Sequence, residues 1–397
     1  MKRFVCFLIC FLFFCPFSAN AVEITQVYPY DAVMNQFWFT PASAEYVSDG
    51  DAKALLLMEF STGRILFAEN EKEHLPIASV TKVISTLLVM EAIDEGKITL
   101  DDVVTVSDHA AGMGGSQIYL EPNETMTVND LLKSLVVVSA NDATVALGEY
   151  ICGSESAFVS AMNKRAQELG CENSNFVNTN GLPVEGQYSC ALDVALITRE
   201  LMKHEKIFDY TGIWMDTIRN GTFGLANTNK LVRFYKGATG MKTGFTGEAK
   251  YCLSGTAKRD GMHLIAVVLG ASTSEKRFAA AKGLLDYGFA NYSITAPEVP
   301  ELSPVAISRG VKSEINVETE QTSILLEKGT GANIESKVII EENLKAPIEA
   351  GATVGRVEYY RNGQEVARED IIACEDVDEV SYGSILSRIF KKIFFKK

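Results

Sequence analysis

A serine followed three positions later by a lysine, in Ser79-Val80-Thr81-Lys82, is the strongest chemical signal in the chain. The pair stands at the start of a helical pattern, where positions i and i+3 share a face, so the ammonium nitrogen can reach the hydroxyl. If burial and neighbouring cations lower the pKa of the lysine, it can act as a general base for a serine nucleophile. The helix N-terminus also favours negative charge, and a backbone N–H there can stabilise an oxyanion. Taken alone, the motif also fits a helix N-cap serine followed by an exposed lysine.

Two further short motifs strengthen the catalytic interpretation. Ser139-Ala140-Asn141 lies between two predicted helices, where a hydroxyl and a carboxamide can point into a cleft, although Asn141 could instead cap the second helix. Lys242-Thr243-Gly244 opens a predicted strand, although a turn with a solvated lysine would have the same sequence. The three motifs occur in this order on a helix start, an inter-helix loop and a strand, which is far less expected by chance than any one of them.

Other catalytic chemistry has little support in the sequence. The histidines are scattered, and HExxH, GxxxxGK[ST], GxGxxG and GxSxG patterns do not occur. A Ser-His-Asp mechanism, a metal site and a bound cofactor are therefore not expected. The four histidines are His74, His109, His204 and His263.

The composition describes an acidic globular protein with room for two domains. The chain has 397 residues, of which 47% are hydrophobic and 22% charged, a balance that excludes wholesale disorder. Its 37 Lys and Arg residues against 51 Asp and Glu residues give a net charge of −14, which argues against nucleic-acid binding.

The N-terminus has the three parts of a secretory signal peptide. Met1-Lys2-Arg3 is followed by an apolar stretch to Phe17 and by the small-residue exit Ser18-Ala19-Asn20-Ala21. That stretch is too short for a membrane-spanning helix, so we expect residues 1–21 to be removed and the protein to be secreted. Five scattered cysteines would remain, which suits buried apolar residues better than a disulfide framework; Cys171 with Cys190 is the one pair considered for a bridge.

The C-terminal residues 381–397 are predicted to form an amphipathic helix. Their apolar side chains have helical spacing, and five cations with no acid occupy the remaining positions, which suits an anionic membrane surface. The alternative is a last core helix capped by lysines, but the acidic run Glu375–Glu379 before it favours a separate arm. We therefore expect peripheral anchoring at the outer face of the cytoplasmic membrane. The apolar residues are Ile385, Leu386, Ile389, Phe390, Ile393 and Phe394.

The elements that must position the three motifs follow an α+β pattern. Strands at 54–60 and 64–68 are expected to form one hairpin, and strands at 250–257 and 262–269 a second. Strands at both ends with helices between them imply an antiparallel sheet closed by sequence-distant pairing, with helices against its faces. Helices are expected from Ser79 to about Gly96 and over 131–136, 143–150, 157–169, 191–202 and 274–287.

A small all-β accessory domain is expected over residues 293–375. Three prolines between 297 and 304 mark a linker, and short alternating strands follow it. Asn362-Gly363 is predicted to be a tight hairpin turn.

In these motifs the chain resembles the serine D-alanyl-D-alanine carboxypeptidases, the low-molecular-weight penicillin-binding proteins. The likeness runs from about Ala42 to the C-terminus and includes Ile77–Lys82, Ser139–Ala143, Asn178–Leu182 and Gly240–Gly244. It implies a catalytic domain over residues 42–292 with the β-lactamase and DD-peptidase fold, an antiparallel sheet flanked by helices with a helical subdomain. It also implies peptidoglycan pentapeptide stems as substrate and β-lactams as covalent inhibitors.

The resemblance assigns catalytic roles to the first two motifs. Ser79 would be the acylated nucleophile and Lys82 its base. Ser139 would relay protons together with Lys242.

The same resemblance implies a set of substrate-binding residues. Asn141 would hold the substrate amide, and Thr243 of Lys242-Thr243-Gly244 would bind the terminal carboxylate. Arg277 would be the cationic partner of that carboxylate unless it is a surface arginine. The backbone N–H groups of Ser79 and Phe245 would form the oxyanion hole, and Phe245 stands where polar residues are common in relatives.

Two alternative functions remain open from the sequence. A serine β-lactamase of class A would need a glutamate that activates the deacylating water; Glu168, Glu172 and Glu185 are available, but none lies in the expected loop motif. A non-catalytic wall-binding protein of the same fold is the other alternative, and the intact motifs argue against it. The sequence does not distinguish carboxypeptidase from endopeptidase activity.

Overall fold

The computed structural model describes residues 46–320, 322–329, 333–381 and 383. The predicted signal peptide, residues 1–21, lies outside the described residues, as does the predicted helix 381–397 apart from Ser381 and Gly383. Along the described chain, no helix combines the length and apolarity that a membrane crossing requires.

A five-stranded antiparallel sheet with the order β2-β1-β9-β8-β7 positions much of the site. Leu55 of β1 pairs with Val268 of β9, so the first and last parts of this region meet in the middle of the sheet. This closure confirms the predicted sequence-distant pairing. The strands are β1 (Ala54–Glu59), β2 (Ile65–Glu69), β7 (Ala238–Thr246), β8 (Lys250–Arg259) and β9 (Met262–Ala271).

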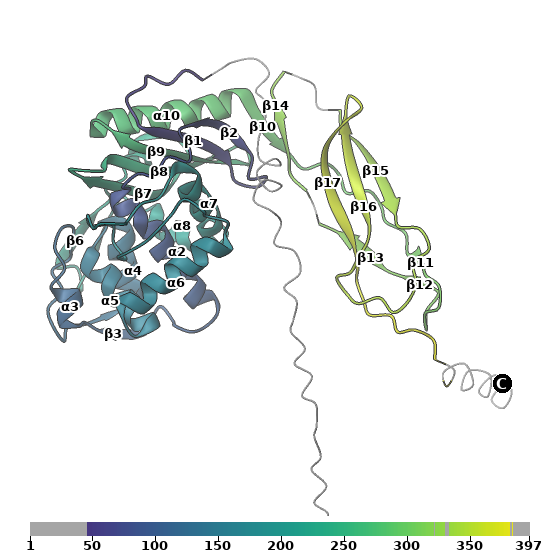
Figure 1. Cartoon of the computed structure of the whole chain (residues 1–397), viewed down its shortest axis with the longest axis horizontal. Coiled ribbons are helices and arrows are strands. Elements are labelled where there is room, and N and C mark those ends of the chain that lie inside the picture. Colours follow the sequence, from purple (N-terminus) through teal and green to yellow (C-terminus); the bar gives the residue numbers. More distant parts are fainter. Residues whose placement is uncertain (1–45, 321, 330–332, 382, 384–397) are drawn as a thin grey trace, which may run out of the picture. The chain divides into compact units, whose positions relative to one another are not determined.

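Helices cover both faces of this sheet (Figure 1). α10 (Ser274–Asn291) packs on β8 and β9, and Leu55 and Leu57 of β1 belong to the same buried core. Because strand side chains alternate, the residues between them face the other side, where α7 (Ala191–Leu201) packs on β1 and β9. Every residue of β1 is therefore buried, which explains why its first five residues, Ala54 to Met58, are all apolar.

The middle of the chain is mostly helical. Thr127 caps the helix that precedes Ser139, because its side chain accepts a hydrogen bond from the backbone N–H of Asp130. The larger helices are α2 (Lys82–Asp94), α4 (Val128–Val137), α5 (Asn141–Cys152) and α6 (Glu155–Glu168). The smaller elements are β3 (Val103–Thr105), α3 (Asp108–Ala111), β4 (Thr125–Thr127), η2 (Glu205–Ile207), α8 (Phe208–Thr211), β5 (Met215–Ile218), β6 (Phe223–Ala226) and α9 (Leu231–Phe234).

The described residues beyond 292 form strands and contain no helix before residue 380. A four-stranded sheet has the order β13-β17-β16-β15, and Ile315, Val357 and Ile371 lie fully buried in the core beside it. The strands are β10 (Tyr292–Thr295), β11 (Val305–Ala306), β12 (Glu314–Ile315), β13 (Val317–Thr319), β14 (Ile324–Glu327), β15 (Glu335–Ile340), β16 (Thr353–Arg361) and β17 (Gln364–Ala373).

The predicted fold class, α+β followed by an all-β region, is confirmed. The helix expected to start at Ser79 begins with the 3₁₀ turn η1 (Ala78–Thr81) and continues as α2. Asn362 and Gly363 join β16 to β17 with φ values of +50° and +79°, as a tight hairpin turn requires. The five described cysteines are free thiols, so Cys171 and Cys190 are not bridged.

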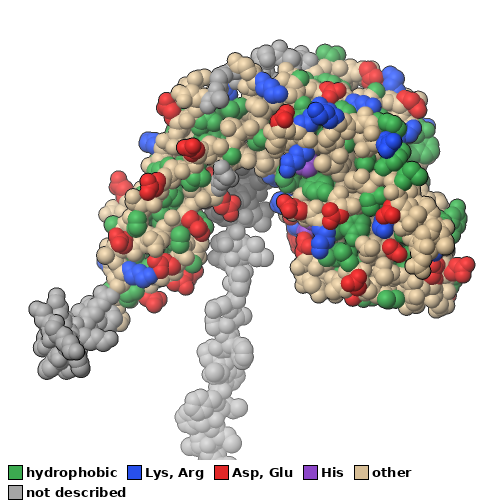
Figure 2. Space-filling model, turned by 180° about the vertical axis from the view of Figure 1, so that it is seen from behind, with side chains coloured by type: hydrophobic (Ala, Val, Ile, Leu, Met, Phe, Trp, Pro, Cys, Tyr) green, Lys and Arg blue, Asp and Glu red, His purple; other side chains and the backbone are tan. Residues whose placement is uncertain are grey.

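Charged side chains are mixed over the surface rather than sorted by sign. Figure 2 shows acidic and basic groups interspersed on the face turned to the viewer, and the described basic side chains on that face do not form one broad patch.

Candidate active site

Ser79 lies half-buried in the turn η1, which leads into α2. Ala78 before it has φ +48°, a left-handed conformation that residues with a Cβ rarely adopt. The backbone of Gly181 packs directly on this turn. It lies so close that a Cβ at position 181 would be only 1.9 Å from the Ala78 carbonyl oxygen. Its own φ of +85° also favours glycine. Backbone contact between two distant segments therefore fixes the position of Ser79.

Lys82, the first residue of α2, is fully buried. Its Nζ lies 3.1 Å from Ser79 Oγ, 2.6 Å from Asn141 Oδ1 and 2.7 Å from the Asn180 carbonyl oxygen. Burial lowers the pKa of Lys82 well below its ordinary value, and the positive charge of Lys242 lowers it further. The structure therefore favours the neutral amine at this position.

The three contacts of Lys82 match the donors and acceptors of a neutral amine. Such an amine has two N–H groups and one lone pair. The oxygens of Asn141 and Asn180 can only accept, so they take the two N–H groups. The lone pair is then left for the hydroxyl of Ser79, which can donate its proton to it.

Ser139 and Asn141 lie between α4 and α5. Ser139 is buried with φ +64°, and its Oγ has no hydrogen-bond partner among the described residues. Both ends of the Asn141 carboxamide form hydrogen bonds, because Oδ1 accepts from Lys82 and one N–H of Nδ2 donates to the Gly114 carbonyl oxygen at 2.6 Å. The Asn141 backbone N–H donates to the Ser116 carbonyl oxygen at 2.7 Å. Asn141 thus orients the lysine and holds the segment 114–116.

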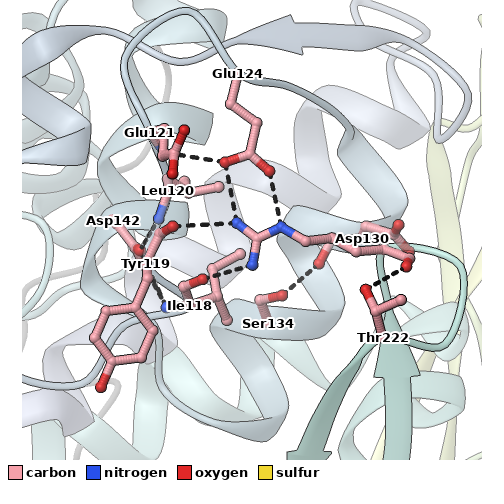
Figure 3. Close-up of polar contacts among 10 residues, drawn as sticks. Ile118, Tyr119, Leu120, Glu121, Glu124, Asp130, Ser134, Asp142 and Thr222 are labelled. Atoms are coloured by element: carbon pink, nitrogen blue, oxygen red, sulfur yellow. Dashed lines mark hydrogen bonds and ion pairs between the residues drawn. The ribbon is translucent and has the colours of Figure 1, made fainter.

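The next residue, Asp142, holds the continuation of that segment (Figure 3). Its buried carboxylate accepts hydrogen bonds from the backbone N–H groups of Ile118 at 3.0 Å and Leu120 at 3.1 Å. Burial raises the pKa of Asp142, and these backbone donors oppose that shift.

Arg219, from the turn between β5 and β6, also binds this segment. Its guanidinium donates to the Ile118 carbonyl oxygen at 2.7 Å and to both carboxylate oxygens of Glu124, at 2.8 and 3.0 Å. The ion pair is about three-quarters buried, with side-chain exposures of 25% and 23%. Residues 118–124 are therefore tied to α5 on one side and to the β5–β6 hairpin on the other.

Lys242 lies on β7, the edge strand of the sheet, and is buried. Its Nζ donates to the Thr243 carbonyl oxygen at 3.0 Å. Burial, together with the positive charge of Arg277, lowers the pKa of Lys242 to about 7. No hydrogen bond joins Lys242 to Ser139 in the part of the chain that the structure describes.

Gly244 brings β7 close to the nucleophile. A Cβ at this position would lie 2.7 Å from the Ile77 carbonyl oxygen and 3.0 Å from the Ser79 backbone nitrogen. Only glycine allows this approach, which explains the third residue of Lys242-Thr243-Gly244. Thr243 is 6% exposed, and its hydroxyl donates to Thr228 Oγ1 at 2.7 Å.

Phe245 lies on β7 and Arg277 on α10, and their side chains differ in exposure. Phe245 is 54% exposed and lies with its ring centroid 4.4 Å from that of Tyr251. Arg277 is only 6% exposed, so it is not a surface arginine. Its Nη1 donates to the carbonyl oxygens of Gly244 at 3.1 Å and Cys252 at 3.2 Å. Burial lowers the pKa of Arg277 to about 10, where it stays charged at neutral pH.

Several residues at this site were not singled out from the sequence. Asn180 accepts a hydrogen bond through its main-chain oxygen, and Gly181 allows close packing because it has no side chain. Asp142 and Arg219 form hydrogen bonds with backbone groups of residues 118–120. The family resemblance covered Asn180 and Gly181 through Asn178–Leu182 and Asp142 through Ser139–Ala143, whereas no signal in the sequence pointed to Arg219. Within the described residues, no three His, Cys, Asp or Glu side chains gather into a metal site.

Family models match both parts of the chain. Residues 40–273 match a family described as D-alanyl-D-alanine carboxypeptidase. Residues 301–379 match the C-terminal domain of penicillin-binding protein 5.

Individual relatives agree with these matches. The chain is 44% identical over 346 residues to D-alanyl-D-alanine carboxypeptidase DacF of Bacillus subtilis, covering 85% of this chain and 89% of that protein. Penicillin-binding protein 5 of Haemophilus influenzae matches 86% of this chain and all of its own, with a TM-score of 0.74 and 31% identity. Penicillin-binding protein D2 of Listeria monocytogenes, in an ampicillin-bound form, is 33% identical over 60% of this chain and 98% of its own, with a TM-score of 0.55.

Proposed function

The chain belongs to the D-alanyl-D-alanine carboxypeptidase family, and from this premise we propose that Ser79 is the residue that the substrate acylates. The protein is a serine-type D-Ala-D-Ala carboxypeptidase that acts on peptidoglycan stem peptides and binds β-lactams covalently. Family membership selects this activity over the β-lactamase and non-catalytic alternatives. We assign the catalytic domain to residues 42–292 and the accessory domain to residues 293–375.

The observation that carries the assignment of Ser79 is the environment of Lys82. A fully buried amine with two carbonyl-type acceptors and one hydroxyl at hydrogen-bond distance is arranged to accept a proton from that hydroxyl. Ser79 Oγ then attacks the carbonyl carbon between the two terminal D-alanines. The new ester bond forms as the peptide C–N bond breaks, and the leaving D-alanine amine takes up the proton.

Ser139 is the proposed carrier of that proton to the leaving amine. Its hydroxyl is buried and has no partner among the described residues, so it is available to a substrate nitrogen. The charge of Lys242 lowers the pKa of Lys82, so the two amines interact electrostatically, and Ser139 is proposed to exchange protons with them. In the second half of the reaction, water attacks the ester, Lys82 accepts its proton, and Ser79 regains its own.

The terminal carboxylate of the substrate is assigned to Lys242 and Thr243. Lys242 supplies positive charge, and the hydroxyl of Thr243 supplies a hydrogen-bond donor on the same strand. Arg277 is proposed to support this site from behind, through its bond to the Gly244 carbonyl oxygen and its charge beside Lys242. Backbone N–H groups of Ser79 and Phe245 are proposed as the oxyanion hole, which the close approach at Gly244 supports. Asn141 retains a proposed contact with the substrate amide.

Secretion and membrane anchoring are also proposed. The signal-peptide pattern of residues 1–21 supports export, and the basic amphipathic pattern of residues 381–397 supports binding to an anionic membrane surface.

The assignment is tested with a peptide that ends in D-Ala-D-Ala and with penicillin. Ser79→Ala is expected to abolish both D-alanine release and the penicilloyl adduct, and Lys82→Ala to slow acylation by several orders of magnitude without loss of the fold. Intact-protein and peptide mass spectrometry locate the adduct. An adduct on another serine of the wild-type protein would remove Ser79 from the nucleophile role.

A further inference from the structure

Asn227-Thr228-Asn229 is a short motif between β6 and α9 that the proposed mechanism does not use. The two asparagines are buried, with exposures of 7% and 1%, whereas the threonine between them is exposed. An exposed threonine held between two buried asparagines has a fixed position at the surface.

The side chains of both asparagines form hydrogen bonds with nearby backbone groups. Asn227 Nδ2 donates to the Ile213 carbonyl oxygen at 2.7 Å, and its Oδ1 accepts from the Asn229 backbone N–H at 2.8 Å. Asn229 Nδ2 donates to the Gly240 carbonyl oxygen on β7 at 2.8 Å. These contacts tie the segment to β7, the strand that carries the proposed carboxylate site.

Thr228 itself joins two parts of the site. Its backbone N–H donates to the Val137 carbonyl oxygen at the end of α4, at 3.2 Å. Its hydroxyl lies 2.7 Å from that of Thr243, with Thr243 as donor. Lys242 Nζ bonds the carbonyl oxygen of the same Thr243. The side chain of Thr243 thus has one described hydrogen-bond partner, and that partner is Thr228.

We infer that Thr228 is a positioning residue that orients the Thr243 hydroxyl toward the terminal carboxylate of the substrate. The inference rests on the proposed role of Thr243. When an anion binds, Thr243 must donate its proton to that anion, so its oxygen becomes free to accept. A hydroxyl can reverse its direction by rotation, and Thr228 then donates to Thr243. The result is a chain O–H···O–H···O⁻ in which each bond polarises the next.

This chain of hydrogen bonds favours substrates with a charged terminal group over neutral ones. A carboxylate draws both protons toward itself, whereas a neutral terminal group polarises the chain less. Losing the first hydroxyl should therefore weaken substrates with a free carboxylate more than neutral ones. Because the carboxylate is bound before and during the reaction, the loss should appear in KM with little change in kcat.

The test compares Thr228→Val with Thr228→Ser on two substrates, a D-Ala-D-Ala peptide and the same peptide with a C-terminal carboxamide. Valine keeps the shape and removes the hydroxyl, and we expect roughly a tenfold rise in KM for the free acid, the size of one hydrogen bond between hydroxyl groups. The carboxamide should change less than threefold, and serine should restore the wild-type KM. Thr217→Val, at an exposed threonine on β5, is the matched control and should leave both substrates unchanged.

Thermal unfolding of each variant checks that the fold is kept, which the exposure of Thr228 predicts. Equal losses on both substrates, a loss in kcat alone, or no recovery with serine would overturn the inference. Failure of the proposed function would look different, because the wild-type protein would then release no D-alanine and form no adduct at Ser79.

Discussion

Two buried lysines in one site are proposed to need opposite charge states. Lys82 must be neutral to accept a proton, and its pKa lies well below its ordinary value because the side chain is fully buried beside another cation. Lys242 must be charged to hold a carboxylate, yet burial and Arg277 lower its pKa to about 7. The proposed mechanism therefore requires a pH at which Lys82 is neutral while Lys242 still carries its charge.

The pKa of Lys242 gives a prediction about the alkaline side of the pH profile. Lys242 is charged below about pH 7 and neutral above it, so kcat/KM for a free-acid peptide should fall as pH rises through that value. Steady-state rates from pH 5 to 10 measure the profile. Lys242→Arg should lower the overall rate but keep the charge, and so remove this alkaline decline. An alkaline decline that stays at the same pH in Lys242→Arg would assign it to another group.

At the scale of elements, hydrogen bonds from two distant parts of the chain hold the segment 118–124. Arg219 connects it to the β5–β6 hairpin, while Asp142 connects it to α5. The segment immediately before it carries the carbonyl oxygens that hold Asn141. Movement of residues 118–124 should therefore reach Lys82 through Asn141.

Arg219→Ala tests this connection. It removes a partly buried bidentate ion pair and a bond to the Ile118 carbonyl oxygen, so we expect a loss of about 2 kcal/mol in unfolding free energy. Acylation by penicillin should slow several-fold, because Asn141 orients Lys82 less well. Arg368→Ala, which breaks an exposed ion pair with Glu365, is the control and should change neither value. Lower stability with unchanged acylation would show that the segment does not act on Asn141.

Sequence patterns predicted the elements well and only part of the site. The β1–β2 and β8–β9 hairpins and the main helices follow from apolar periodicity, because that periodicity reflects which face is buried. Ser79, Lys82 and Asn141 form motifs of reactive side chains, and the structure joins them by hydrogen bonds. The remaining contacts escape such patterns for physical reasons. A main-chain oxygen such as that of Asn180 can come from any residue type, and nothing in the sequence around Thr228 shows that its hydroxyl bonds Thr243.

Arg277 shows a second limit of sequence reasoning. Its position near the start of a helix with neighbouring charged residues allowed a surface location as well as a site location. The structure buries it under β7 and β8 against two carbonyl oxygens, which depends on how α10 packs on the sheet. Packing of this kind is a tertiary property that local spacing does not encode.

For the whole molecule, the predicted anchor gives the clearest test. Deleting residues 381–397 should move the enzyme to the soluble fraction and leave turnover of a small peptide unchanged. High salt should release only part of the full-length protein, because salt screens the five cations but leaves the apolar face unaffected. Cell fractionation and vesicle sedimentation measure both effects. Continued sedimentation of the truncated protein, or complete release by 1 M salt, would contradict this anchor.

The pairing of β1 with β9 has a consequence for when the enzyme becomes active during folding. These strands are separated by about two hundred residues, and β7 joins the sheet only through β8 and β9. Contacts this distant in sequence form slowly, because a long loop must close before they contribute. A growing chain that already contains Ser79 and Ser139 but not yet β7 thus has the nucleophile without the strand that is proposed to bind the substrate carboxylate. Reactivity toward penicillin should therefore appear only when the last strands have docked, so the rate of labelling during refolding reports the final folding step.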